Sequence, residues 1–150
     1  MNRSLHELPT LPCACASLRR ASRALTHMYD EALRPLGLRV TQFTILQVLT
    51  LAGEVSQGQL AEILVMDSTT LTRTLGIMVR EGWIAERRGK DRRERRLRLA
   101  KAGRFQFSRA LPAWERTQVQ VARELGERWH EVLNLSNEIT SLNMKRGGLS

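Results

Sequence analysis

The residues of this sequence with the clearest potential for chemistry are its arginines, whose guanidinium groups can bind phosphates. The segment 73–109 holds 13 Lys or Arg residues against 4 Asp or Glu, whereas the rest of the chain holds 11 of each sign, so the net charge of +9 belongs to this segment. Positive charge confined in this way is what a surface that binds the phosphates of a nucleic acid requires. An arginine-rich genome would explain the choice of arginine over lysine but not its confinement. We therefore predict a nucleic-acid-binding surface in this segment.

The sequence predicts neither an enzyme nor a metal protein. It shows no nucleophile and base in a recognisable spacing, no glycine loop for phosphates and no dinucleotide fingerprint. His6, His27 and His130 are isolated, so we expect no metal site and no cofactor. Cys13 and Cys15 are too few and too close together for a secreted disulfide framework, and we expect reduced thiols.

The composition favours one soluble globular domain. The 150 residues are 42% hydrophobic and 26% charged, which is ordinary for such a domain. No apolar run approaches the roughly 20 residues that span a bilayer, and the N-terminus lacks the apolar core of a signal peptide. We expect a cytoplasmic protein without membrane contact.

Two short helices are expected to position one part of the basic surface. Ser56 can cap the first, and Asp67 or Ser68 can cap a second over about 69–81, before Gly82. Short helices joined by about four residues predict a helix-turn-helix. One polar side of the second helix holds Thr69, Arg73, Gly76 and Arg80. Two arginines and a glycine that allows close approach suit a helix in the major groove of DNA.

A β-hairpin is expected to position the other part. Segments 83–87 and 96–99 alternate between apolar and polar residues around the polar tip 88–93. We interpret this hairpin as the wing of a winged helix-turn-helix.

Long helices are expected at both ends of the chain. Apolar residues at steps of three and four over 11–36 predict a helix with Pro12 in its first turn and an end near Arg34, and another helix follows over about 41–53. Heptad-like spacing predicts two C-terminal helices, one over 107–125 with a kink at Pro112 and one over 129–139, with a break near Gly126 between them. Residues 145–150 are expected to be disordered. Because one winged helix cannot cover so much apolar surface, we expect a homodimer, with dimerisation helices at about 1–36 and 104–145 and a DNA-binding lobe at about 41–100.

The order of elements and several segments resemble the MarR family over nearly the whole chain. Segment 33–43 looks like the family's junction between its first two helices, and 67–73 looks like the start of its recognition helix. Residues 91–93, followed by strand 97–99 and Gly103, match the family's wing signature. The resemblance implies a mainly α fold with a small β-hairpin wing, a winged helix-turn-helix with dimerisation helices at both termini.

The resemblance also implies the residues that bind DNA. Arg93 would enter the minor groove, and Asp91 would hold its guanidinium in place. Contacts in the major groove, to bases and phosphates, would come from Ser68, Thr69, Thr70, Thr72 and Arg73. Nonspecific attraction to the DNA backbone would be strengthened by Arg92, Arg95, Arg96 and Arg98. The expected partner is a pseudo-palindromic operator in double-stranded DNA.

The start of the first helix resembles the OhrR branch of the family, whose members sense peroxides through a cysteine. Cys15 and Tyr29 match that cysteine and one tyrosine partner, whereas Arg19 and Val40 stand where other tyrosines are expected. The helix dipole and Arg19 would favour a thiolate at Cys15, but Cys15 also belongs to the apolar stripe, where a cysteine would only pack. Cys13 points away from Cys15 around the helix, which leaves only an intersubunit disulfide.

Two signals therefore stay open for a sequence-specific regulator, most simply a repressor. One is thiol oxidation, and the other is a small aromatic or amphipathic ligand bound near Arg19, His27 and Tyr29. The rival function is an architectural protein that coats DNA without reading its sequence.

Overall fold

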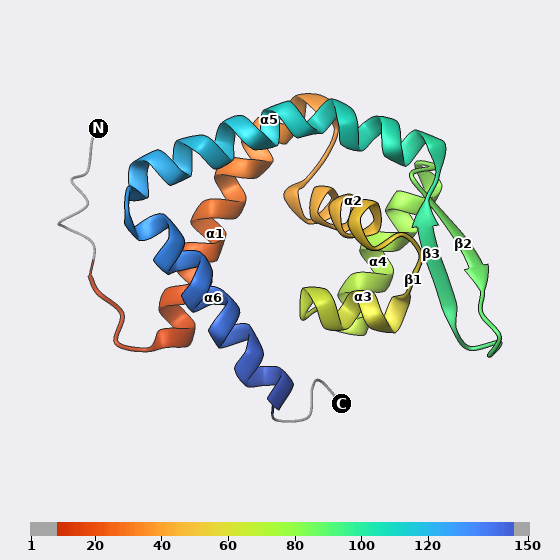
Figure 1. Cartoon of the computed structure of the whole chain (residues 1–150), viewed down its shortest axis with the longest axis horizontal. Coiled ribbons are helices and arrows are strands. Elements are labelled where there is room, and N and C mark those ends of the chain that lie inside the picture. The colour runs from red at the N-terminus through yellow and green to blue at the C-terminus, as the bar shows by residue number, and fades with distance from the viewer. Residues whose placement is uncertain (1–8, 146–150) are drawn as a thin grey trace.

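The structure is a computed structural model that describes residues 9–145 (Figure 1). Its elements are α1 (Ala14–Leu33), the 3-10 helix η2 (Arg34–Leu36), α2 (Val40–Ala52), β1 (Val55–Ser56), α3 (Gln57–Leu64), α4 (Ser68–Arg80), β2 (Ile84–Arg88), β3 (Arg95–Leu99), α5 (Lys101–Leu125) and α6 (Arg128–Lys145). The predicted fold class, mainly α with a hairpin wing and long helices at both ends, is confirmed. None of the described helices is long and apolar enough to cross a membrane.

The hydrophobic core joins the winged helix-turn-helix lobe, which we define as α2, α3, α4 and the sheet, to the first half of α5. Phe43 on α2 is fully buried and stacks on Phe107 and Trp114 of α5, with ring centroids 5.2 Å and 5.4 Å apart. Leu71 and Leu75 are buried on the side of α4 that faces the core. This packing leaves the opposite side of α4 facing solvent, where binding residues are needed.

The sheet has the strand order β1-β3-β2, and both pairings are antiparallel. The hairpin predicted from the alternating segments is confirmed, with Ile84 opposite Leu99 and Arg88 opposite Arg95. The third strand, β1, was not predicted, because its two residues Val55 and Ser56 are too few to show an alternation.

Capping residues begin the two helices of the helix-turn-helix where expected. The Ser56 hydroxyl accepts a hydrogen bond from the backbone N–H of Gln59, whose side chain in turn accepts from the Ser56 N–H. Asp67 caps α4 by accepting from the Thr70 N–H at 2.9 Å. Gly82, just after α4, has φ +75°, a left-handed conformation that glycine adopts without a Cβ penalty.

The start of α1 corrects one expectation. Pro12 precedes the helix instead of lying in its first turn, because α1 begins at Ala14 with Cys13 as its extended N-cap. The first helical hydrogen bond runs from the Ser17 N–H to the Cys13 carbonyl, and the Ser17 hydroxyl binds the carbonyl of Leu11 before the helix.

The C-terminal helices follow the predicted pattern. α5 continues through Pro112 and crosses the molecule from the sheet towards α1 (Figure 1). It ends at Gly126, which has φ +59°, as the predicted break requires. Lys145 still belongs to α6, which corrects the N-terminal limit of the expected disordered end. Residues 146–150, like His6, lie outside the described residues.

Candidate nucleic-acid interface

The N-terminal half of α4 presents a row of hydroxyl side chains to solvent. Ser68, Thr69, Thr70 and Thr72 are exposed, while Leu71 between them is buried in the core. The Thr70 N–H donates to the Asp67 carboxylate, and the nearby hydroxyl and N–H of Thr70 hold the pKa of that carboxyl below its ordinary value.

Gln57 joins this row from the neighbouring helix. Its Nε2 donates to the Thr72 hydroxyl at 2.9 Å, and its Oε1 is buried without a partner among the described residues. Sequence reasoning missed Gln57, since its contact lies 15 residues away along the chain. The hydrogen bond fixes the Thr72 hydroxyl at the surface of α4.

The wing tip is held by hydrogen bonds of its own backbone. The Asp91 carboxylate accepts from the backbone N–H of Arg93 at 3.0 Å, and the Gly89 N–H donates to the Glu94 carbonyl at 2.8 Å. This corrects the expectation that Asp91 holds the Arg93 guanidinium, because an aspartate in a tight turn reaches the N–H two residues on more readily than a long side chain. The guanidinium of Arg93 is left exposed, without an ion pair in the described part of the chain.

A surface groove of about 650 Å³ separates α3 and the start of α4 from the wing. Its lining brings together five of the predicted DNA-binding residues, from two elements: Ser68, Thr72, Asp91, Arg93 and Arg95. Arg92 lines a second hollow of the wing, which it shares with Arg93 and Arg95 and with Glu86, Arg87 and Arg88. Hydroxyl donors therefore face guanidinium groups across one concave surface.

The remaining predicted residues lie outside this groove. Thr69, Thr70 and Arg73 are exposed elsewhere on the first two turns of α4, and Arg80 lies in its last turn, about 10 Å further along the axis than Arg73. Arg95 lines the groove, but its Nη2 also pairs with Glu86 at 2.9 Å, which partly neutralises its charge.

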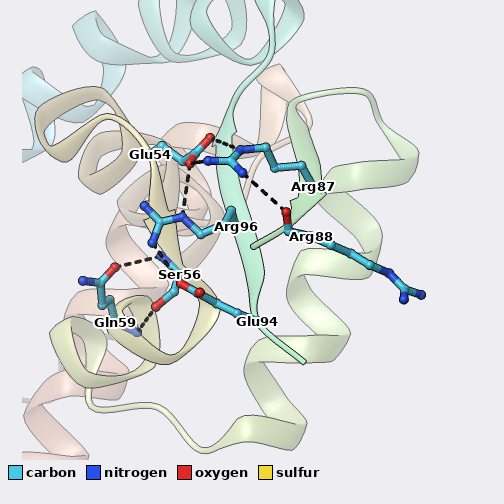
Figure 2. Close-up of polar contacts among 7 residues, drawn as sticks. All are labelled: Glu54, Ser56, Gln59, Arg87, Arg88, Glu94 and Arg96. Atoms are coloured by element: carbon cyan, nitrogen blue, oxygen red, sulfur yellow. Dashed lines mark hydrogen bonds and ion pairs between the residues drawn. The ribbon is translucent and has the colours of Figure 1, made fainter. Parts of the chain in front are cut away.

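A cluster of charged residues joins the two strands of the wing, one residue pair before the tip, to the end of α2 (Figure 2). Glu54 accepts two hydrogen bonds from Arg87, at 2.5 Å and 2.9 Å, and one from Arg96 at 3.1 Å. Arg96 also donates to Glu94 at 3.0 Å. The hydrogen bonds from Arg87 and then Arg96 lower the pKa of Glu54. The hydrogen bond to Glu54 raises the pKa of Arg87, and those to Glu94 and then Glu54 raise the pKa of Arg96. Sequence reasoning missed Glu54, and it therefore expected a free charge at Arg96, which the structure pairs with Glu54 and Glu94.

The predicted sensor residues are spread along α1. Cys15 is exposed on the first turn, so packing inside its own chain is not its role, and Cys13 is exposed as the N-cap. Tyr29 lies about 21 Å along the helix from Cys15, and its hydroxyl donates to Gln118 of α5. Burial raises the pKa of the Tyr29 hydroxyl.

The residues proposed for a ligand pocket are also separate. Arg19 is exposed, and His27 lies at the surface 3.4 Å from Glu31. Arg19 and Tyr29 are about 15 Å apart along the axis of α1. No group of three or more potential metal ligands lies together within residues 9–145.

Comparisons with known proteins agree with this architecture. A model of the MarR family matches residues 36–94, from η2 to the wing tip. The uncharacterized HTH-type transcriptional regulator YwoH of Bacillus subtilis (strain 168) is 30% identical over 84 residues, and the match spans 56% of this chain and only 61% of that protein.

Among solved structures, the M. tuberculosis transcriptional regulator MosR in complex with DNA is 36% identical, with a TM-score of 0.81. That similarity covers 90% of this chain and 98% of the MosR chain. A second MosR structure is 33% identical, with a TM-score of 0.78, and covers 89% and 97% of the two chains.

Proposed function

Because the chain belongs to the MarR family of transcriptional regulators, we propose that it binds an operator in double-stranded DNA as a homodimer and represses transcription until a signal releases it. The observation that carries this proposal is the groove between α4 and the wing. Hydroxyl groups of Ser68 and Thr72 line one side of it, and the free guanidinium of Arg93 lines the other. MosR, the similar regulator, was solved in complex with DNA.

The two sides of the groove suit different parts of a duplex. A helix that presents short hydroxyl side chains and Arg73 can lie in the major groove, where it contacts bases and phosphates. An exposed arginine at a hairpin tip suits the narrow minor groove, whose negative potential attracts a guanidinium. Arg93 is such a residue, and Arg92 beside it can reach the adjacent backbone.

Dimerisation is supported by the apolar side chains that α6 leaves uncovered. No residue of α6 is buried, and Val132, Leu135 and Leu142 are all exposed on one side of the helix. A second copy of the chain would cover them. Two recognition helices about one helical turn of DNA apart would then match a pseudo-palindromic operator.

We propose two alternative signals for release. Cys15 lies in the first turn of α1, is exposed, and precedes Arg19 by one turn, so an oxidant can reach its sulfur atom. The alternative is a small aromatic or amphipathic ligand that binds near His27 and Tyr29. Either signal would act by changing the separation of the two recognition helices.

The experiment that tests the function measures affinity for the intergenic DNA upstream of the protein's own gene, at fixed salt, against a scrambled duplex. A specific regulator should prefer its site by roughly 10³-fold or more. Equal affinity for both duplexes would favour an architectural protein instead.

The same assay separates the two signals. Binding is measured before and after organic hydroperoxide, with Cys15→Ser in parallel. Loss of binding in the wild type alone would establish a thiol switch at Cys15. Binding that is indifferent to the oxidant would leave the ligand as the signal to search for.

A further inference from the structure

Glu54 connects two arginines that face each other across the wing. Arg87 on β2 and Arg96 on β3 are direct cross-strand partners in the sheet. Like charges in that position repel each other and weaken a hairpin. Oε1 of Glu54 lies 2.5 Å from Arg87 and 3.1 Å from Arg96, so one carboxylate accepts from both guanidinium groups (Figure 2).

The contact is well formed for a surface ion pair. Arg87 binds Glu54 through two nitrogen atoms and both carboxylate oxygens, the bidentate geometry that gives arginine pairs their specificity. The side chains of Glu54 and Arg96 are 25% and 26% exposed, which limits screening of their contact by water, whereas the side chain of Arg87 is 58% exposed and is screened more strongly. Glu94 provides a second acceptor for Arg96.

The wing therefore carries two classes of basic residue. Arg87, Arg95 and Arg96 are paired with carboxylates of the lobe. The other class is exposed, has no ion pair within residues 9–145, and consists of Arg88, Lys90, Arg92, Arg93 and Arg98. Four of those five lie within the tip 88–93, all but Arg98, and Arg93 lines the groove.

We infer that Glu54 is a positioning residue that sets the specificity of DNA binding, because it keeps Arg87 and Arg96 away from phosphates and fixes the two strands of the wing just before its tip. This inference rests on the proposed function. Without the carboxylate, the guanidinium groups of Arg87 and Arg96 become free to attract any duplex, whatever its sequence. The tip, which reads the operator in the proposed function, then contributes a smaller share of the binding.

The test is the salt dependence of binding to a duplex of scrambled sequence, for the full chain and for Glu54→Gln. Each guanidinium that gains a phosphate should make the slope of log K against log salt steeper by about 0.9. For one such contact, the affinity of Glu54→Gln relative to wild type should grow about threefold when salt falls from about 200 to 50 mM. The preference for the operator over the scrambled duplex should fall in parallel.

Two matched variants control for simpler explanations. Glu62→Gln makes the same change in net charge on α3, where the Glu62 side chain is exposed and has no hydrogen bond or ion pair within the described residues, so its slope should equal that of wild type. Glu54→Asp keeps the charge and should behave like wild type. Thermal unfolding shows whether each variant remains folded.

Arg87→Gln keeps the inference testable if Glu54→Gln does not fold. If Glu54 withholds Arg87 from DNA, removing Arg87 from the wild type should leave the salt slope unchanged. A slope shallower by about 0.9 would mean that Arg87 already contacts a phosphate, and would overturn the inference. In the double variant Glu54→Gln/Arg87→Gln, the slope should return part of the way to that of wild type.

The outcomes separate this inference from the function beneath it. If the wild type binds its operator specifically but Glu54→Gln has an unchanged slope and an unchanged preference, the role of Glu54 is wrong and the regulator stands. If the wild type shows no preference for the operator, both proposals fail together.

Discussion

The winged helix-turn-helix lobe and the terminal helix α6 differ in how far their apolar side chains are buried within one chain. In the lobe, Phe43, Leu60 and Leu97 are fully buried. On α6 no residue is buried, and Leu135 and Leu142 are 56% and 59% exposed. Both regions have apolar residues at helical spacing, but only the lobe buries them within the chain.

The lobe buries its apolar side chains within one chain, whereas those of α6 would be covered only by the proposed second copy. Folding of the lobe places the wing beside α4 without outside help, since β3 pairs with both β1 and β2 and packs into the core. The apolar stripe of α6 gains nothing from folding alone. Under the proposed function, the lobe binds one half of the operator and α6 determines whether two lobes act together.

The largest expected effect comes from breaking the proposed dimer. Leu135→Asp/Leu142→Asp places two charges on the apolar stripe of α6, so the double variant should be a monomer with a folded lobe. Because two linked half-sites gain affinity over one, its binding to the operator should fall by about a hundredfold or more. Light scattering gives the oligomeric state, and fluorescence anisotropy gives the affinity.

The matched control places the same charges outside the apolar stripe. Asn137 and Ser141 are exposed and lie about 100° to 160° around the helix from Leu135 and Leu142, so Asn137→Asp/Ser141→Asp should leave both the oligomeric state and the affinity unchanged. An equal effect in both double variants would mean that α6 is not the interface.

The close packing of α5 against the lobe can be tested at Gly103, in the first turn of α5. A Cβ added there would lie 2.0 Å from the carbonyl oxygen of Trp83, a backbone atom that cannot move aside. Gly103→Ala should therefore lower the free energy of unfolding by about 3 kcal/mol, as overpacking of a core does. Urea denaturation measures this change.

At Gly76 the same replacement of glycine by alanine should have the opposite effect on the free energy of unfolding. A Cβ at this position on α4 meets nothing within 4 Å, so Gly76→Ala should raise the free energy of unfolding by about 1 kcal/mol through helix propensity alone. Similar stabilities for the two variants would contradict the close approach of α5 to Trp83.

Local signals explain why much of the lobe could be predicted from sequence. Ser56 and Asp67 cap helices through residues three positions away, and the hairpin follows from alternation within each strand. The contacts that were missed are long-range. Glu54 meets Arg87 and Arg96 at separations of 33 and 42 residues, which no local pattern encodes.

The site shows the same division. Local patterns and the family resemblance were enough to nominate Ser68, Thr72 and Arg93, which the fold brings to one groove. They did not give the contact that each side chain makes, as the backbone hydrogen bond of Asp91 shows, because a sequence motif does not specify which atom of a turn a short carboxylate reaches.

A smaller effect is expected for one arginine of the wing. Arg93→Ala removes an exposed guanidinium whose side chain has no ion pair within residues 9–145, so stability should be unchanged. Operator affinity should fall by about tenfold to a hundredfold, the cost of losing one arginine that reads DNA. Arg98→Ala, on the same hairpin but outside the lining of the groove, should cost less. Equal losses would contradict the assignment of the tip.

The smallest effect concerns the pH dependence of the stability that Glu54 gives to the wing. The pKa of Glu54 in the folded protein is lowered by hydrogen bonds from Arg87 and Arg96, so the folded state favours the carboxylate more than the unfolded state does. Its contribution is therefore fully present above the ordinary glutamate pKa of about 4.3, and is lost as pH falls through the lowered value. Glu54→Gln should be less stable than wild type at neutral pH, and the gap should close in acid.

Urea midpoints measured from neutral pH down to about pH 3 would show this closure. Glu62→Gln serves as the reference, because its exposed side chain makes no hydrogen bond or ion pair among residues 9–145 and its midpoint should track wild type at every pH. A gap for Glu54→Gln that persists undiminished in acid would mean that the carboxylate charge is not what stabilises the wing. The packing of the Glu54 side chain, and not its charge, would then account for the difference in stability between wild type and Glu54→Gln.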